Sequence, residues 1–202
     1  MIITMARKIK ERKKQKMNAA TKQMTRREEI ENIVDQKIQE NDLGKPSFDL
    51  IKFLKDKEGY EIVLQNMDDD TTGLIIINDK EKIEGTEFNK LIAINSSLQN
   101  DPNYIQRRRF IVAHEYAHSQ LHKRDSVLFA HRDTQKRETE AEQEADFFAR
   151  CLLMPRNLVN EVLGSEEAKQ LSDSGKIAYI SKIFNVTEKK ARQRLKEITH
   201  NV

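Results

Sequence analysis

Two histidines and a glutamate stand at a spacing that suits a metal ion and a proton acceptor. His114, Glu115 and His118 form the pattern H-E-x-x-H within RRRFIVAHEYAHSQLH, residues 107–122. An α-helix repeats every 3.6 residues, so His114 and His118 share one face and can bind one zinc ion. Zinc lowers the pKa of a bound water toward about 7, and the carboxylate of Glu115 can take its proton. The pattern therefore predicts zinc-dependent hydrolysis of peptide bonds, with Glu115 as the catalytic base.

A catalytic zinc site needs a third protein ligand, and the next predicted helix, residues 137–154, can supply it. Glu142 and Asp146 are four residues apart and share a face with two alanines, which let helices approach closely. We therefore assign Glu142 to the metal. Asp146 is expected to accept a hydrogen bond from a ligating imidazole and to fix its tautomer. Glu140 and Glu144 point elsewhere on this helix and are expected to be solvated.

Three other side chains near the pattern remain alternatives as ligands. His122 lies four residues beyond the second histidine of the pattern and could lean toward the metal, although such a residue is more often outside the ligand set. His131 follows in a less regular segment, and Glu138 stands at the start of the second helix. Two histidines and one carboxylate would also hold iron or manganese, but the helical H-E-x-x-H context favours zinc.

The helix that carries the pattern should run from about Pro102 to His122, with Asp101 as its N-cap. Short strands rich in β-forming residues are predicted before it, at residues 60–64, 74–77 and 91–94. The first two should pair as a hairpin with a long loop, and residues 80–89 predict a loop. Residues 127–129 can form a fourth short strand or an active-site loop. Together these segments predict a small antiparallel sheet covered on one face.

Helical periodicity predicts further helices on both sides of this region. Residues 28–43 repeat apolar side chains at helical spacing, and Ser47 can cap a short second helix. A short helix should follow Pro155. Residues 177–184 and 187–198 then predict a helix, a tight turn and a helix with Thr187 as N-cap. The basic residues of the last helix could contact DNA, although we favour its packing on the rest of the protein; they are Lys189, Lys190, Arg192 and Arg194.

The net charge of +3 conceals an uneven distribution along the 202 residues. Residues 1–27 carry ten Lys and Arg side chains and one acidic side chain, whereas the other residues carry 26 basic and 32 acidic ones. A solvated, poorly ordered or loosely helical arm is the interpretation that we favour for residues 1–27. A contact with nucleic acid, through this arm or through residues 176–198, is the alternative.

The cellular setting is indicated by what the sequence lacks. Its single cysteine, Cys151, excludes an intrachain disulfide and fits a reducing compartment. No apolar run approaches the roughly 18 residues that would predict a membrane span, and the first residues lack the apolar core of an export signal. We therefore expect a cytoplasmic protein without a membrane partner. Cys151 has no activating neighbour in the sequence and should pack in the core rather than act as a nucleophile.

Three stretches taken together resemble the ImmA/IrrE family of metallo-endopeptidases. They are RRRFIVAHEYAHSQLH at residues 107–122, HRD at residues 131–133 and ETEAEQEADFFARCLLMP at residues 138–155. The similarity extends from about Gly73 to Leu195, because GLIIIN and LIAIN, at residues 73–78 and 91–95, resemble strands of the family. One departure is Tyr116-Ala117, where the family commonly has Leu-Gly, and Tyr116 could alter the wall of the cleft.

The resemblance implies a zinc-dependent, cytoplasmic, gluzincin-like protease. It implies His114, His118 and Glu142 as ligands and Glu115 as catalytic base. Members of this family act on helix-turn-helix repressors that silence mobile elements, phage genes or damage-response genes. A repressor of this kind is therefore the expected protein substrate. The basic arm lies outside the usual family core, and the resemblance implies nothing about it.

These observations predict an α+β protein: a helical zincin-like domain with a small three-stranded, mostly antiparallel sheet and a C-terminal helix-turn-helix-like extension. The expected divisions are a basic arm at residues 1–27, a peptidase domain at residues 28–163 and a C-terminal region at residues 164–202. Two other functions remain open. One is a regulatory module that binds a repressor or DNA without cutting it, and the other is a partner in a toxin-antitoxin system.

Overall fold

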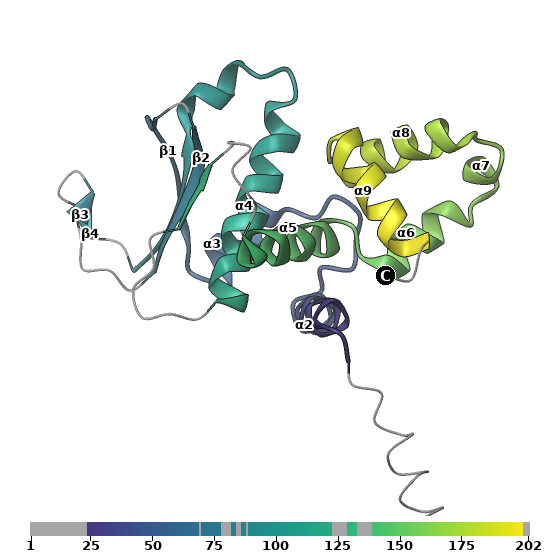
Figure 1. The fold of residues 1–202 in the computed structure, drawn as a ribbon, viewed down its shortest axis with the longest axis horizontal. Helices are drawn as coiled ribbons and strands as arrows, with labels where there is room; N and C mark the ends of the chain where they lie inside the picture. Colours follow the sequence, from purple (N-terminus) through teal and green to yellow (C-terminus); the bar gives the residue numbers. More distant parts are fainter. Residues whose placement is uncertain are drawn as a thin grey trace, which may run out of the picture.

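A computed structural model describes residues 24–68, 70–77, 89–122 and 139–199, and describes residues 82–83, 86–87 and 129–132 by their backbone. Predictions for residues 1–23 and for the side chains of His131 and Glu138 lie outside these described residues. The elements, labelled as in Figure 1, are α2 (Arg26–Glu40), α3 (Leu50–Asp56), β1 (Glu61–Gln65), β2 (Thr71–Ile77), β3 (Lys82–Ile83), β4 (Thr86–Glu87), β5 (Lys90–Asn95), the 3-10 turn η1 (Ser96–Asn100), α4 (Tyr104–Leu121), β6 (Phe129–Arg132), α5 (Glu140–Leu153), α6 (Arg156–Leu163), α7 (Glu166–Lys169), α8 (Asp173–Phe184) and α9 (Glu188–Thr199).

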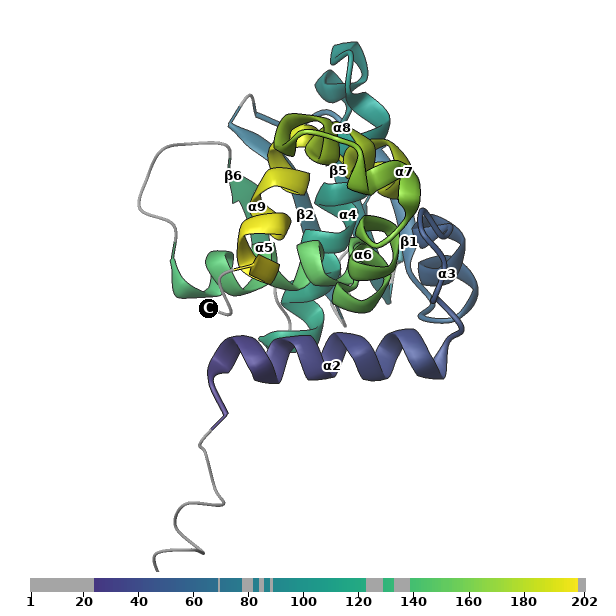
Figure 2. The ribbon, with the colours of Figure 1, turned by 90° about the vertical axis from the view of Figure 1, so that its right-hand side faces the viewer.

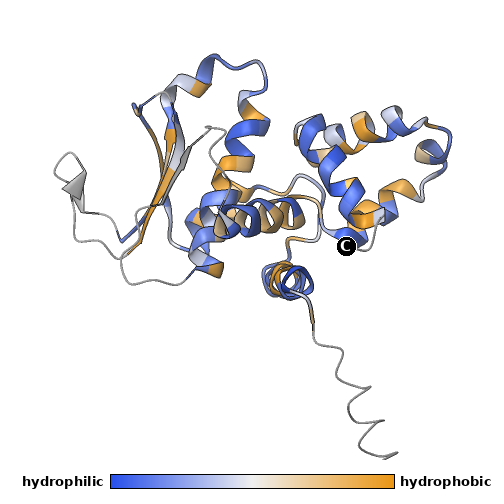
Figure 3. Ribbon diagram, in the orientation of Figure 1, coloured by the Kyte–Doolittle hydropathy of each residue, from blue (hydrophilic) through white to orange (hydrophobic). Residues whose placement is uncertain are grey.

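Four strands form a mixed sheet in the order β1-β5-β2-β6. β5 runs antiparallel to β2, and β2 runs antiparallel to β6, so two of its three pairings are antiparallel. Hydrophobic residues occupy much of the sheet (Figure 3), and Leu91, Ile92, Ala93 and Ile94 of β5 are completely buried. The predicted α+β class and the small, mostly antiparallel sheet are confirmed. β6 adds a fourth strand, beginning at the last residue of the segment 127–129.

The predicted hairpin between residues 60–64 and 74–77 is wrong. β5 lies between β1 and β2 and pairs with β1 in parallel, with Glu61 opposite Leu91 and Gln65 opposite Asn95. Propensity identifies a strand through its side chains, but its neighbours are chosen by packing that a short sequence window does not contain. Residues 80–89, predicted as a loop, contain the small separate pair β3 and β4.

The helix α4 lies against the sheet. The helix α5 crosses α4 on the side of α4 that faces away from the strands (Figure 1). Every residue of α4 from Arg109 to His118 is buried. Ala113 and Ala117 of α4 and Ala145 and Ala149 of α5 are fully inaccessible to solvent. Small side chains on both helices allow their backbones to approach closely. This crossing brings residues from the two sequence motifs into one buried region.

Several helix starts differ from the prediction by a few residues. α4 begins at Tyr104, and Asp101 is not its N-cap. The Asp101 carboxylate accepts hydrogen bonds from the backbone N–H of Asn103 and from Arg107, so it stabilises the turn before the helix. The short helix α3 has Asp49, and not Ser47, as its N-cap. Thr187 does accept a hydrogen bond from the backbone N–H three residues later, as predicted for the last helix.

The C-terminal helices pack on the rest of the protein. The predicted helix, tight turn and helix are present as α8 and α9, and Asn185 adopts the left-handed conformation between them. Arg194 of α9 is 1% exposed and donates to the carbonyl oxygen of Met154 at the end of α5. The side chain of Lys190 also turns inward, toward Asp146. Two of the four cations that could have contacted DNA are therefore engaged within the protein.

The helix α2 runs along one side of the body, below α5 and α9 in Figure 2. It begins at Arg26, so Arg26 and Arg27 belong to this helix. Thr25 and Glu28 form a reciprocal capping box at its start. Glu31 contacts Arg156 Nη2 at 2.9 Å and Arg194 Nη2 at 2.7 Å, which joins α2 to α6 and α9.

No helix within the described residues is both long enough and apolar enough to span a bilayer. Cys151 is buried with 1% exposure, as expected for a packing residue. Burial raises the pKa of its thiol to about 12, which keeps the thiol protonated and unreactive.

Replacing Glu31 with Gln should remove the nearer of the two carboxylates that pair with the buried guanidinium of Arg194, and Glu197 remains at 3.7 Å. We expect the free energy of unfolding to fall by about 3 kcal/mol at pH 7, measured by urea denaturation, because a buried charge that loses its closest partner is costly. The exposed Glu40→Gln variant on the same helix should change it by less than about 0.5 kcal/mol.

The same pair of variants tests the pH dependence. Burial opposes ionisation of Glu31, but hydrogen bonds from Arg156 and Arg194 outweigh it and lower its pKa below the ordinary 4.5. A lowered pKa stabilises the folded state above that ordinary value, and the contribution is lost as the pH falls through the folded-state pKa. The stability difference between wild type and Glu31→Gln should therefore shrink below about pH 4.5. A difference that stays constant down to pH 3 would contradict this assignment.

Candidate metal centre

His114, His118 and Glu142 bring three potential ligand atoms together where α4 crosses α5. Their ligand atoms all lie within 4.8 Å of one another. His114 Nε2 lies 3.0 Å from Glu142 Oε2 and 3.1 Å from His118 Nε2, and His118 Nε2 lies 3.4 Å from Glu142 Oε1. Both imidazoles are 1% exposed, whereas the Glu142 side chain is 26% exposed and opens the group to solvent. The two sequence motifs therefore meet at one point in space.

These separations fit a small tetrahedral cation. Ligand atoms at about 2.05 Å from a zinc ion in tetrahedral geometry stand roughly 3.3 Å apart. The observed distances of 3.0, 3.1 and 3.4 Å are close to that value. The donor set of two imidazoles and one carboxylate is also the set that catalytic zinc uses, because it leaves one coordination position open. The residues present therefore fit a zinc ion.

Asp146 lies one helical turn beyond Glu142 and supports the first histidine. Its Oδ1 accepts from His114 Nδ1 at 3.0 Å, so the other ring nitrogen, Nε2, faces Glu142 and His118. Burial opposes ionisation of Asp146, but His114 and Lys190 outweigh it and hold its pKa well below the usual range. Asp146 is therefore an ionised hydrogen-bond acceptor that fixes the tautomer and orientation of His114.

Lys190 reaches Asp146 from the C-terminal helix, a partner that sequence reasoning missed. Its Nζ lies 2.9 Å from Asp146 Oδ2 and stands over the ring of Phe110, 3.7 Å from the ring centroid. Burial lowers the pKa of Lys190, and Asp146 opposes this effect. Arg150 also donates to Asp146 Oδ2, at 3.1 Å. Both cations stabilise the charge of a carboxylate that is itself largely buried.

The second histidine has its own chain of contacts. His118 Nδ1 lies 3.3 Å from His122 Nδ1, and His122 Nε2 lies 3.1 Å from Glu144 Oε2. Arg26 then donates two hydrogen bonds to Glu144, at 2.8 and 2.9 Å. The prediction that Glu144 is solvated is wrong, because its side chain is only 15% exposed. Glu140 is exposed as predicted.

These contacts also show where the side chain of His122 lies. Its side chain contacts His118 from the Nδ1 side, opposite the nitrogen that faces Glu142, so it lies outside the group of three potential ligand residues. Arg26 is separated from Glu144 by 118 positions in the sequence, which is why local periodicity could not reveal the contact. The signal that was available is the i, i+4 spacing of His118 and His122 on one helix face.

Glu115 is completely buried beside the triad. Neither of its carboxylate oxygens has a hydrogen-bond partner within the described residues. Burial raises the pKa of Glu115 to about 8, since a low-polarity environment disfavours the charged form; His114 opposes this rise and Glu142 adds to it. An unpartnered buried carboxyl group is unusual, because it forgoes hydrogen bonds that it would make in water. In its ionised form this carboxyl group can accept a proton from a small polar molecule.

Gly73 of β2 makes room for this carboxylate. A Cβ atom at Gly73 would lie 2.6 Å from Ile111 Cγ2 and 3.1 Å from Glu115 Oε1. The first distance is shorter than any normal contact between carbon atoms, so a larger residue would push β2 away from α4. Glycine therefore permits the close approach of the sheet to the face that carries Glu115.

Tyr116 does not line the cleft, which corrects the expectation that it alters the cleft wall. It is completely buried, and its hydroxyl donates to Glu58 at 2.7 Å. Its ring makes edge-on contacts with Phe53, Tyr60 and Phe148. Tyr116 thus fixes the side of α4 that faces away from the metal centre.

Comparison with known families agrees with this geometry. A peptidase family model, described as the IrrE N-terminal-like domain, matches residues 57–196. The matched region contains the whole sheet, α4, α5 and the helices that follow them. The chain therefore belongs to this family of metallopeptidase type, as the resemblance to ImmA/IrrE proteins predicted. No curated protein matches the chain significantly.

Removing the charge of either supporting carboxylate should weaken metal binding. For Asp146→Asn and for Glu144→Gln we expect zinc affinity to fall about 10- to 100-fold, because each carboxylate orients an imidazole, directly or through His122. Competition with a chromophoric chelator measures the affinity. Glu140→Gln is the matched control, since Glu140 is exposed on the same helix, and it should bind zinc as the wild type does. Equal affinities in all four proteins would show that these contacts do not position the ligands.

Proposed function

We propose that this protein is a zinc-dependent endopeptidase in which His114, His118 and Glu142 hold the metal and Glu115 is the catalytic base. The observation that carries the proposal is the mutual spacing of the three ligand atoms, 3.0 to 3.4 Å, next to a buried carboxylate without a partner. Membership of a peptidase family supports the same reaction class.

Each residue of the proposed site has a separate chemical role. Zinc held by the triad would supply the Lewis acidity that polarises a peptide carbonyl and makes water acidic enough to react near neutral pH. Glu115 accepts the proton of the attacking water and returns it to the leaving amine. Asp146 and His122 hold the two imidazoles in orientation. Burial around Glu115 excludes bulk water and strengthens each of these electrostatic contacts.

A helix-turn-helix transcriptional repressor is the proposed substrate, and the cytoplasm is the proposed setting. The resemblance to ImmA/IrrE proteins supports this substrate class. The single buried cysteine supports a reducing compartment. Cleavage at one or a few sites would remove the repressor and switch on the genes that it controls, such as those of a mobile element, a phage or a stress response.

The Glu115→Gln variant separates proteolysis from mere binding. We expect it to retain about one zinc ion per chain and to lose cleavage by at least about a thousandfold, because the amide cannot accept the proton. His118→Ala should lose both metal and cleavage. Metal content is measured by atomic emission. Cleavage is measured by mass spectrometry after incubation with the helix-turn-helix proteins encoded beside the gene.

Two controls sharpen this experiment. Zinc chelation should stop the wild-type reaction, and adding zinc back should restore it. If the Glu115→Gln protein still released the repressor from its operator without cutting it, the protein would be a binding regulator and not a protease. Cleavage at an undiminished rate in Glu115→Gln would refute the assigned base.

A further inference from the structure

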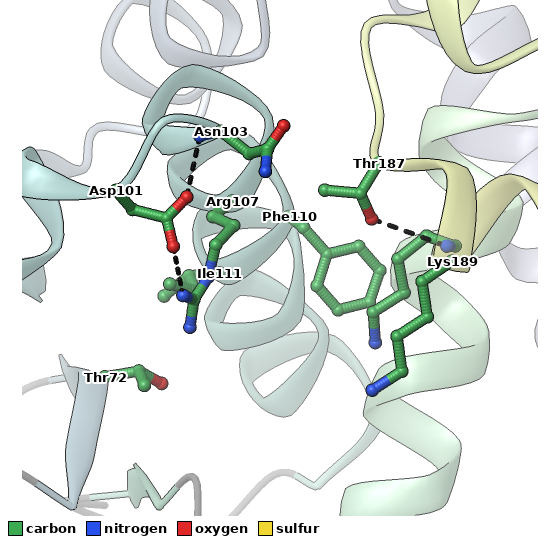
Figure 4. A pocket seen from close by; sticks show the side chains of 9 residues that line it. Thr72, Asp101, Asn103, Arg107, Phe110, Ile111, Thr187 and Lys189 are labelled. Carbon is green, nitrogen blue, oxygen red and sulfur yellow. Dashed lines mark hydrogen bonds and ion pairs between the residues drawn. The ribbon is translucent and has the colours of Figure 1, made fainter. Parts of the chain in front are cut away.

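A hollow of about 380 Å³ lies beside the metal centre. Its walls come from three elements that are far apart in the sequence: the start of β2, the first two turns of α4 with the turn before them, and the first turn of α9 (Figure 4). The apolar part of the lining is formed by Phe110 and Ile111. Its lining includes none of His114, Glu115, His118 and Glu142.

Two residues that line the hollow stand on α4 one helical turn before the proposed catalytic residues. Phe110 and Ile111 precede His114 and Glu115 by one helical turn, which corresponds to roughly 6 Å along the helix axis. On the opposite wall, Thr72 lines the hollow, and the next residue of β2 is Gly73, where an added Cβ atom would lie 3.1 Å from Glu115 Oε1. An extended peptide advances roughly 3.3 Å per residue, so the hollow lies roughly two or three residues from a bond held at Glu115.

The lining is positively charged. Arg107, Lys189 and Lys190 contribute three cations, and Asp101 contributes one carboxylate. Arg107 donates to Asp101, and Lys190 is bound to Asp146. Lys189 is exposed and has no ion-pair partner within the described residues. In Figure 4, Arg107 and Lys189 lie on either side of the Phe110 ring.

We propose that this hollow is a substrate subsite that selects an acidic side chain, Asp or Glu, roughly two or three residues from the bond to be cleaved. The proposal rests on the proposed endopeptidase function. The methylene groups of such a side chain would pack on Phe110, and its carboxylate would reach Lys189 at the rim. A charge-assisted hydrogen bond of this kind is stronger than a neutral one, so it can discriminate Glu from Gln.

A nucleic acid is a poorer occupant. Binding to a phosphate backbone requires several cations that contact successive phosphates. On α9, Arg194 is buried and Lys190 is held by Asp146, so Lys189 and Arg192 are the cations left exposed among the four considered. One acidic side chain matches this arrangement better.

The test uses the zinc-loaded full chain and a proteome-derived peptide library, with cut sites read by mass spectrometry. The wild type should show Asp and Glu enriched at one fixed position near the cut. Three synthetic peptides with Glu, Gln or Lys at that position then give kcat/KM values. Lys189→Glu should lower kcat/KM for the Glu peptide about tenfold and raise it for the Lys peptide, while the Gln peptide changes little.

Arg192→Glu is the matched control, because Arg192 is exposed on the same helix but does not line the hollow. This variant should keep the wild-type ranking of the three peptides by kcat/KM. The subsite would be overturned if the wild type showed no enrichment of Asp or Glu near the cut. It would also be overturned if Lys189→Glu left the ranking of the peptides by kcat/KM unchanged. Neither outcome would contradict the protease function.

Two further outcomes separate the alternatives. If the zinc-loaded wild type cuts neither a peptide of the library nor a neighbouring repressor, the endopeptidase function fails, and the subsite fails with it. The second measurement is fluorescence anisotropy of a labelled DNA duplex. If Lys189→Glu weakens DNA binding and leaves peptide preference unchanged, the hollow is a nucleic-acid contact, and the acidic subsite is overturned.

Discussion

The close crossing of α4 and α5 is the constraint on which the site depends. Two imidazoles on one helix and a carboxylate on the other meet at 3.0 to 3.4 Å only because the backbones approach closely. The alanines at positions 113, 117, 145 and 149 are fully buried, and such small side chains permit packed helices to approach closely. A larger residue at any of these fully buried positions would overpack the core around the crossing and shift the backbone. The sheet below and the helices around them hold this crossing in place.

A second constraint is electrostatic, and it explains why the flanking segments are part of the site. Glu144 and Asp146 are buried enough that their charges need compensation. The start of α2 supplies Arg26 to Glu144, and α9 supplies Lys190 to Asp146. Each carboxylate in turn supports one histidine of α4, through His122 in the first case and directly in the second. Segments at opposite ends of the described chain therefore both contribute contacts that support the two imidazoles.

The sequence predicts relative positions correctly where the helical repeat alone determines which side chains share a face. The spacings of His114 with His118 and of Glu142 with Asp146 correctly placed pairs of side chains on common faces, because a helix fixes them locally. It failed for the order of strands, since the parallel pairing of β1 with β5 depends on packing across 30 residues of chain. It also failed for Glu144, because both of its partners come from other helices. Long-range charge pairing leaves no periodic signal in a single sequence.

The buried carboxyl group of Glu115, which has no hydrogen-bond partner within the described residues, lowers the stability of the folded protein at the proposed catalytic site. A fully buried carboxyl group without a hydrogen bond destabilises a folded protein by roughly 1 to 3 kcal/mol. Packing could have removed that cost by placing a donor on β2, yet β2 presents Gly73, which has no side chain at all. The arrangement denies the two oxygens a competing protein partner within the described residues. The rigid surroundings of Tyr116, on the far side of the same helix, hold α4 in place without touching this face. One face of α4 thus carries the contacts of Tyr116 that stabilise the helix, and the other face carries the proposed catalytic residue Glu115.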